Sequence, residues 1–331
     1  MLPWLWIERS YMNTRFLLWT TALSALSCGL GCNTWIDYPE EYTPAAAPAP
    51  APVTIDLDFP PVTALNHFGF AAIIERYSRV SDDRVMVDYD GFAADGEAQF
   101  FLNQYVGLVG TLNPSDLAGK NERLAFWLNA YDAVVVRGII QQACLALSDP
   151  AEPESARAPK PDGCDHSFST FAGSFFDVAY PFAGQALTLN QVENGVLRGD
   201  RDHESLEMLS AETVAAIDLW HQELWGGETP DARIHAGLNC GVVGCPDLHV
   251  YVGPTIDEEL DAVTRRWLDN PGKGAGPNGI SRIFEWFKAD FDASHGGVEA
   301  FITAFRTNGL DGVDMDRFLV YDDRLNSIEN P

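Results

Sequence analysis

Basic residues are scarce in this chain. Its 331 residues include 21 Lys and Arg against 48 Asp and Glu, which gives a formal net charge of −27 at pH 7. A chain this acidic repels the phosphate backbone of nucleic acids and the headgroups of anionic lipids. The composition therefore argues against nucleic acid as a partner, and we expect membrane contact only through an N-terminal lipid anchor.

The N-terminal region lacks an apolar run long enough to span a bilayer as a helix, which takes about 20 residues. Its apolar run at residues 16–26 is short and ends in small residues, which is typical of a secretory signal. The small residues before Cys28 and Cys32 indicate a bacterial lipoprotein signal in residues 1–32, and we expect Cys32 to be the acylated residue. An ordinary cleaved signal peptide is the alternative. Both predict export to the cell envelope, lipid-anchored or periplasmic.

Residues 33–56 contain a run of alternating Pro and Ala. Such a run cannot form a helical or sheet ladder and favours extended polyproline II, so it predicts a semi-rigid tether. No repeat period and no second linker follow, and we expect residues 57–331 to form a single domain. The 46% of apolar residues in the full chain is enough to close a sizeable core.

Apolar spacing predicts a mostly helical α+β domain with a small antiparallel sheet. Helical spacing is found at residues 64–80, 94–112, 118–144, 190–197, 206–220, 257–267, 280–288 and 298–305. Strand patterns are found at 85–89, 176–189 and 318–321. Because apolar residues cover most of the surface of the 118–144 helix, we expect this helix to be the spine of the core.

Two of the cysteines bracket a loop rich in proline and charge. Cys144 ends the long helix and Cys164 closes the loop that follows it. An exported chain permits disulfides, and a bridge across about 20 residues contributes roughly 3 kcal/mol in the chain-entropy model. We predict a structural Cys144–Cys164 disulfide.

The other two cysteines lie among histidines and glycines in RIHAGLNCGVVGCPDLHVY, residues 233–251. Three interpretations are open. Cys240 could be a nucleophile activated by His235, with the backbone N–H of Gly241 stabilising an oxyanion. A second is a zinc site formed by two thiolates and two imidazoles, from His235, Cys240, Cys245 and His249. The third is a Cys240–Cys245 disulfide with histidines nearby. Spacing alone does not decide between them.

Five separated blocks, in the same order, resemble the domain of unknown function 547 family over residues 60–327. The blocks are ERLAFWLNAYDAV (122–134), LTLNQVENGVLR (187–198), RIHAGLNCGVVGCPDL (233–248), FEWFKADF (284–291) and YDDRLN (321–326). In plant-like members the residue matching Cys240 remains a cysteine while the pair matching Gly244-Cys245 is Ser-Ser. The resemblance therefore implies a function for Cys240 that needs no partner at position 245. The family pattern is also similar to papain-like cysteine hydrolases, which implies a helix carrying the nucleophile on a small antiparallel sheet.

The resemblance implies a role for several residues. Cys240 would attack an acyl carbon, His235 would be the base, and Glu193 would orient the imidazole. Glu193 is also three residues after Asn190, a capping-box spacing, and His235 could be a core histidine.

Four polar or glycine residues are expected to support these three. Asn129 and Asp132 lie three apart on the long helix and share a face, where they would hold the cysteine loop, and Asn129 could also lie near the oxyanion. Asn239 and Gly241 flank Cys240. The resemblance leads us to expect Asn at the position that Asp132 occupies.

The sequence therefore predicts a thiol-dependent hydrolase or acyltransferase acting on an amide or ester of a small-molecule or peptide-like substrate. Nothing in the sequence indicates a nucleotide, flavin or haem cofactor. The alternative from another class is an envelope binding or assembly lipoprotein without catalysis.

Overall fold

The computed structural model describes residues 67–81, 84–146, 158–173 and 175–330. The predicted signal, the acylation site at Cys32 and the Pro/Ala tether lie outside the described residues, and so does most of the loop after the long helix. Among the described residues, no helix is both long and apolar enough to cross a bilayer.

The described chain is a mostly helical α+β domain, as predicted. Its helices are α1 (Phe68–Tyr77), α2 (Tyr89–Ala94), α3 (Gly96–Thr111), α4 (Lys120–Ile139), α5 (Leu189–Gln191), α6 (Ala211–Trp225), α7 (Ile234–Gly237), α8 (Ile256–Asp269), α9 (Ile283–Trp286), α10 (Lys288–His295) and α11 (Val298–Phe305). Its strands are β1 (Ser78–Ser81), β2 (Arg84–Val87), β3 (Ala179–Phe182), β4 (Gln185–Thr188), β5 (Ala275–Gly276) and β6 (Gly279–Ile280). They form three separate antiparallel pairs, β1–β2, β3–β4 and β5–β6, where we expected one small sheet.

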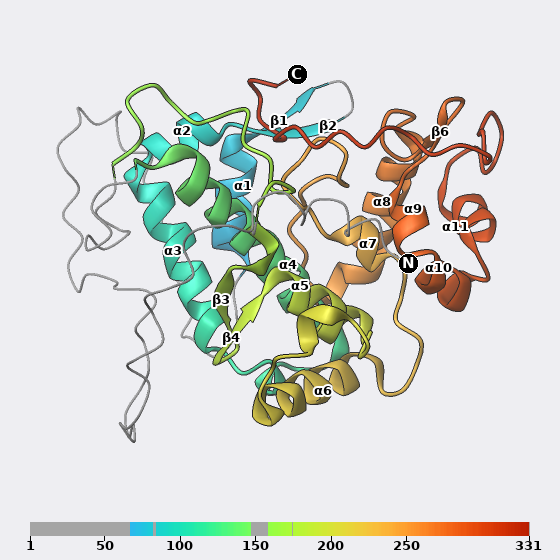
Figure 1. Ribbon diagram of the computed structural model, residues 1–331, viewed down its shortest axis with the longest axis horizontal. Helices are drawn as coiled ribbons and strands as arrows, with labels where there is room; N and C mark the ends of the chain where they lie inside the picture. Colours follow the sequence, from blue (N-terminus) through green and yellow to red (C-terminus); the bar gives the residue numbers. More distant parts are fainter. Residues whose placement is uncertain (1–66, 82–83, 147–157, 174, 331) are drawn as a thin grey trace, which may run out of the picture.

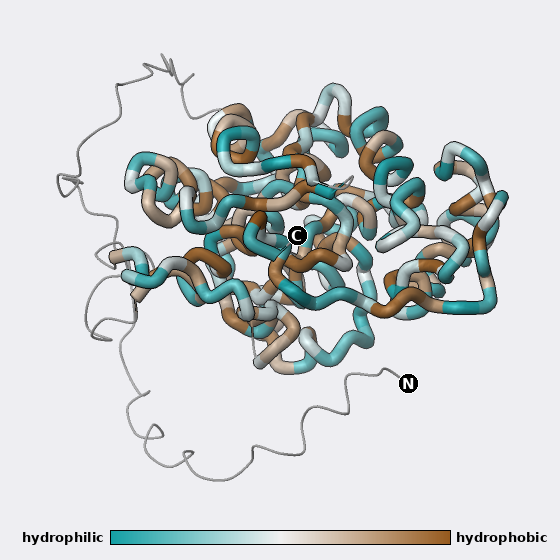
Figure 2. Tube along the Cα trace, turned by 90° about the horizontal axis from the view of Figure 1, so that it is seen from above, coloured by the Kyte–Doolittle hydropathy of each residue, from teal (hydrophilic) through white to brown (hydrophobic). Residues whose placement is uncertain are grey.

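Helix α4 is the spine of the core. All its side chains from Leu124 to Ile139 are buried, because apolar residues lie on every face, and a π-helical segment, Ile140–Cys144, continues it. Helices α1 to α3 lie on one side of α4, α6 lies below it in the view of Figure 1, and α8 to α11 lie on the other side. Apolar stretches run through the interior in Figure 2, while polar stretches are common at the periphery.

The C-terminal segment returns across the molecule. Phe318, Leu325 and Ser327 form single β-bridges to Ile280, Val242 and Val87, so the expected strand at 318–321 is only one bridge. Figure 1 shows the C-terminus beside the β1–β2 hairpin. The segment therefore links the hairpin, the cysteine loop and β6.

The predicted Cys144–Cys164 disulfide is present. It joins the end of the π-helical segment to the far side of the loop. Lys160 strengthens this closure because its Nζ donates to the Ala143 carbonyl at 2.7 Å. Both disulfides of the described chain are compatible with an exported protein.

Candidate functional site

The cysteine loop, residues 239–247, follows α7 and is buried along its whole length. The C-terminal segment holds it through backbone hydrogen bonds: Val243 N–H donates to the Arg324 carbonyl at 2.9 Å, and Gly244 N–H donates to the Asp322 carbonyl at 2.8 Å. The loop is thus held in place by a segment that lies about 80 residues further along the sequence.

Cys240 and Cys245 are joined by a disulfide. Cys240 is 8% exposed and Cys245 is 5% exposed. The hydroxyl oxygen of Tyr321 lies 3.2 Å from the Cys240 sulfur and 3.3 Å from the Cys245 sulfur. The expectation of a free Cys240 thiol is therefore wrong for this state, since a bridged sulfur is neither a nucleophile nor a metal ligand.

Aromatic rings surround the Cys240–Cys245 bridge. The ring of Tyr321 packs on Trp286 with centroids 4.8 Å apart and on Phe171 at 5.5 Å, and Phe171 packs on Phe176 at 5.4 Å. Burial, together with the negative charge of Glu193, raises the pKa of Tyr321 well above its ordinary value. Tyr321 is therefore a neutral hydrogen-bond donor at physiological pH.

His235 does not face Cys240. Its Nε2 lies 2.8 Å from the Asp290 Oδ2, its ring stacks on Phe287 with centroids 4.1 Å apart, and its side chain is only 1% exposed. Asp290 also accepts hydrogen bonds from the Arg198 guanidinium at 2.6 and 3.3 Å. Burial alone would raise the pKa of Asp290, but the bonds from His235 and Arg198 outweigh it and lower the pKa to about 2. His235 is a core histidine with a carboxylate partner, so the expected base is not in place.

Glu193 lies in a π-helical segment, Val192–Arg198, and its Oε2 accepts a hydrogen bond from the Tyr131 hydroxyl at 3.2 Å. The capping box is formed by Thr188 and Gln191, so Glu193 is not a cap. Its described partner is Tyr131, so the expectation that it orients His235 is wrong.

The polar residues on α4 hold backbone in the cysteine loop and just beyond it. The Asn129 amide donates to the Tyr251 carbonyl at 2.7 Å and accepts from the Tyr251 N–H at 2.8 Å. The Asp132 Oδ1 accepts from the Asn239 N–H at 2.9 Å, and burial raises the pKa of Asp132 well above its ordinary value. Tyr251 therefore holds the Asn129 carbonyl and one of its two amide N–H groups, and a contact of Asn129 with an oxyanion stays a prediction.

Asn239 and Gly241 are also used within the loop. The Asn239 Nδ2 donates to the Pro246 carbonyl at 2.6 Å, and its Oδ1 accepts from the Gly241 N–H at 3.0 Å. Gly241 has φ +83°, and a Cβ there would overlap the Ile139 side chain, so only glycine suits the position. The Gly241 N–H that we assigned to an oxyanion is therefore occupied.

The four residues of the zinc interpretation do not come together. Both cysteines are bridged, His235 bonds Asp290, and the ring of His249 packs on Tyr251 with centroids 4.8 Å apart. Burial, with a smaller effect of Arg266, lowers the pKa of His249 to about 4. No cluster of three metal-ligating side chains is found in the described part of the chain.

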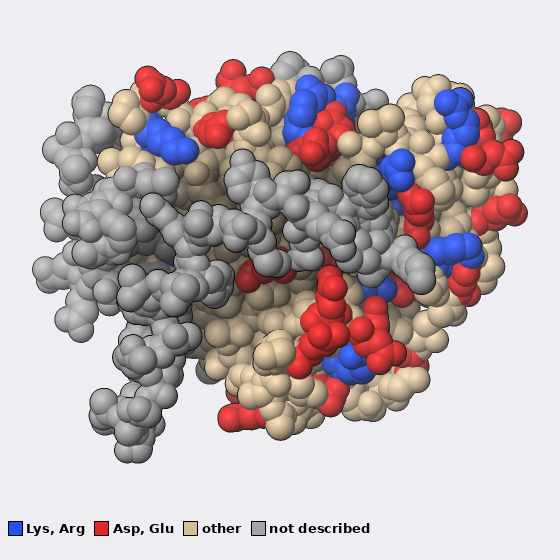
Figure 3. Space-filling view, viewed as in Figure 1, with Lys and Arg blue, Asp and Glu red and all other residues tan. Residues whose placement is uncertain are grey.

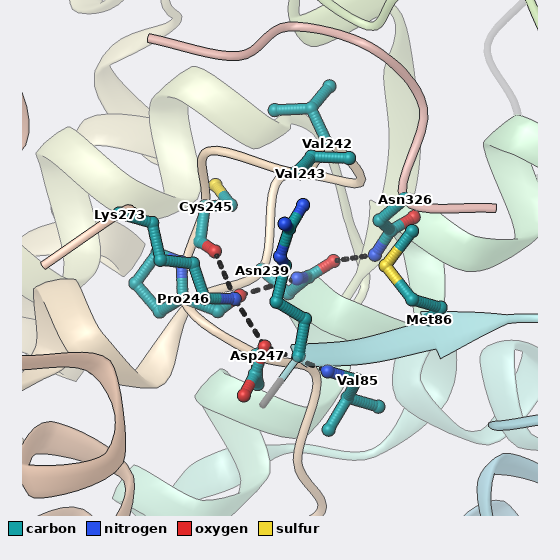
Figure 4. Close-up of a pocket in the computed structure, with 11 residues that line it drawn as sticks. Val85, Met86, Asn239, Val242, Val243, Cys245, Pro246, Asp247, Lys273 and Asn326 are labelled. Carbon is teal, nitrogen blue, oxygen red and sulfur yellow. Dashed lines mark hydrogen bonds and ion pairs between the residues drawn. The ribbon is translucent and has the colours of Figure 1, made fainter. Parts of the chain in front are cut away.

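A buried lysine supports the loop from behind, as Figure 4 shows. The Lys273 Nζ donates to the Cys245 carbonyl at 3.1 Å and to the Asp247 carboxylate. Asp247 also accepts from the Val85 N–H at 3.1 Å, which ties the loop to β2. The space among these residues is too narrow for a water molecule, so this is packing and not a ligand cavity.

A family comparison agrees with the resemblance found in the sequence. Residues 114–268 match the family described as "Protein of unknown function, DUF547". This part of the chain is therefore similar to the DUF547 family, as the sequence blocks predicted. No curated protein and no solved structure gives a significant match.

The DUF547 match includes Glu193, His235 and both cysteines of the loop, but three residues that complete the site lie beyond it. These are Lys273, Asp290 and Tyr321. Asp290 lies in the FEWFKADF block and Tyr321 in the YDDRLN block, and neither block indicates a contact with the cysteine loop. Lys273 lies in a glycine-rich stretch that resembles an ordinary turn. Only the fold shows that these residues contact the cysteine loop and His235.

Proposed function

We propose that this protein is an envelope binding or assembly lipoprotein, exported and held at the membrane by a lipid on Cys32, and that it does not catalyse acyl transfer through the predicted triad. The observation that supports the proposal is that Cys240 and His235, the expected nucleophile and base, are each bonded to another residue. The Cys240 sulfur is bonded to Cys245, and the His235 imidazole is bonded to Asp290. A nucleophile and its base must lie within hydrogen-bond reach, or be joined by one water.

A second candidate, a thiol-dependent hydrolase or acyltransferase active in the reduced state, has one observation in its favour. The Tyr321 hydroxyl lies 3.2 Å from the Cys240 sulfur, where it could donate to a thiolate after the bridge is reduced. Against it, burial and apolar surroundings raise the pKa of a thiol, and Glu193 adds negative charge nearby. We therefore rank it below the binding function.

The two candidates differ in the reactivity of Cys240 once Cys245 is removed. We would compare Cys245→Ala with Cys240→Ala/Cys245→Ala by iodoacetamide alkylation from pH 5 to 10, with the site mapped by mass spectrometry. The binding function predicts that native protein has no reactive thiol at either position. It also predicts that Cys240 in the single variant alkylates slowly, with an apparent pKa at or above about 8.5, and that both variants hydrolyse a p-nitrophenyl ester equally. Fast alkylation at pH 6 with ester turnover dependent on Cys240 would establish the hydrolase instead.

The lipid anchor is tested separately by labelling expressing cells with radioactive palmitate. The proposal expects label on the wild-type chain and on Cys28→Ser, and loss of label in Cys32→Ser. Label lost in Cys28→Ser alone would move the anchor to Cys28, and an unlabelled wild-type chain would remove it.

A further inference from the structure

A groove of about 340 Å³ lies beside the cysteine loop, apart from the disulfide. It is formed by the β1–β2 hairpin, the end of α8 and the side chain of Asp247, and its volume falls at the lower end of the range for small-molecule sites. Two valines, Val80 and Val85, contribute an apolar wall, and Val80 is 77% exposed. Two arginines, Arg84 and Arg266, contribute positive charge.

Two arginines and two aspartates line the groove, in a chain whose net charge is −27, and both aspartates already have partners. Asp247 has a buried carboxylate and lines the groove together with Arg84 and Arg266. Asp247 is already used by Lys273 and by the Arg266 Nε at 3.2 Å. Asp269, the other acid of the groove, accepts from the N–H and hydroxyl of Thr307 at 2.9 and 2.5 Å.

Arg84 makes no hydrogen bond or ion pair with any described residue, although it is half-buried. Asp322 is close enough for Arg84 to lower its pKa, but Asp322 is paired with Arg324 at 2.7 Å. Burial lowers the pKa of Lys273; the bond to Asp247 opposes this effect, and Arg84 and Arg266 add smaller lowering effects.

A guanidinium presents a planar fork of donors that matches a carboxylate or a phosphate. We propose that the groove binds a small organic anion, a phosphate monoester or carboxylate, whose charged group contacts Arg84 and Arg266 and whose apolar part lies on Val80 and Val85. This inference rests on the proposed binding function and names the chemistry of its ligand. Such an anion could be free or could be the headgroup of a lipid.

The test uses the full mature chain and phenyl phosphate as the probe, with binding followed by isothermal titration calorimetry in low and high salt. The wild-type protein should bind phenyl phosphate more tightly than inorganic phosphate and should not bind phenethylamine. Added salt should weaken binding, because the interaction is between charges. Arg84→Gln should weaken binding about tenfold or more, since a charge-assisted hydrogen bond is lost.

Arg265→Gln is the matched control, because Arg265 is the exposed neighbour of Arg266 on α8 and does not line the groove. It removes the same charge and should bind phenyl phosphate within about twofold of wild type. Equal melting temperatures of the two variants would show that both are folded. Equal affinity in Arg84→Gln and wild type, or no binding by wild type at 10 mM probe, would overturn the proposal.

Vesicles distinguish the two sources of the anion. Sedimentation with phosphatidylcholine vesicles that contain phosphatidic acid, lost in Arg84→Gln, would identify a lipid headgroup. Binding of phenyl phosphate without sedimentation would identify a free anion. The alkylation experiment tests the proposed non-catalytic function separately. A reactive Cys240 together with intact phenyl phosphate binding would overturn the non-catalytic function alone. An unreactive Cys240 together with no phenyl phosphate binding would overturn the anion site alone.

Discussion

The bond between His235 and Asp290 is the clearest place to measure whether the expected base is structural. We predict that Asp290→Asn destabilises the protein by about 2 to 4 kcal/mol at pH 7. The lowering of the Asp290 pKa from 3.8 to about 2 corresponds to about 2 kcal/mol of stabilisation. The loss can be larger, because Arg198 is only 10% exposed and would lose its main carboxylate partner.

The pH dependence of this loss has a defined sign. A carboxylate whose pKa is lowered in the folded state stabilises the protein above the unfolded pKa of 3.8, and this stabilisation is lost as the pH falls through about 2. The difference in unfolding free energy between wild type and Asp290→Asn should therefore be constant from pH 7 to 5. It should shrink below pH 4.

Urea denaturation at several pH values measures both effects, with Asp292→Asn as the control on the same helix. Asp292 pairs with Lys288 at 2.5 Å, but the two side chains are 48% and 66% exposed, and such pairs contribute at most about 1 kcal/mol. Equal stabilities of the two variants at pH 7 would refute the reasoning. A gap that widened toward pH 3 would refute the assigned sign.

Three further predictions concern the residues that hold the cysteine loop and its neighbours. Asp132→Asn should become increasingly stabilising relative to wild type as the pH rises above 4, because the folded state holds the proton on the buried carboxyl at pH values where the unfolded chain releases it. Urea denaturation at pH 4 and pH 8 would show this change, and an equal difference in unfolding free energy at both pH values would contradict it. Gly241→Ala should cost more than 2 kcal/mol, whereas Gly226→Ala, also at positive φ but with open space around it, should cost about 1. Cys144→Ser should cost roughly 3 kcal/mol in the same assay, and an unchanged midpoint would show that this disulfide adds nothing.

Local patterns in the sequence predicted those parts of the fold that depend on nearby residues. Helix α11 begins and ends at the predicted residues, and α4 is the buried spine because its apolar residues cover all its faces. The predicted helix at 64–80 was too long, because residues 78–81 pair with β2 as a strand. The helical spacing of apolar residues continues past Tyr77 in the sequence. That spacing does not show that residues 78–81 have a hydrogen-bond partner in β2.

Spacing along the chain was a poor guide to the candidate site. His235 is five residues from Cys240, yet its partner is Asp290, which is 55 residues away. Tyr321 reaches the Cys240 sulfur from 81 residues away. Contacts of this range depend on how α7, α10 and the C-terminal segment pack, and no local pattern encodes that packing.

The same contacts explain why sulfur chemistry and ligand binding fall on different parts of this loop. The disulfide, the bond from Asp132 to Asn239 and the bonds from the C-terminal segment fix the loop on its sulfur side. Lys273 fixes it from behind through Cys245 and Asp247. Asp247 then holds Arg266 at the edge of the groove, while Arg84 on β2 makes no hydrogen bond or ion pair with any described residue. On the face drawn in Figure 3, acidic and basic side chains are intermixed over the described surface. Arg84 bonds no described residue and lines the groove with the exposed Val80, so its guanidinium is a better location for a ligand than the buried, bridged sulfur of Cys240.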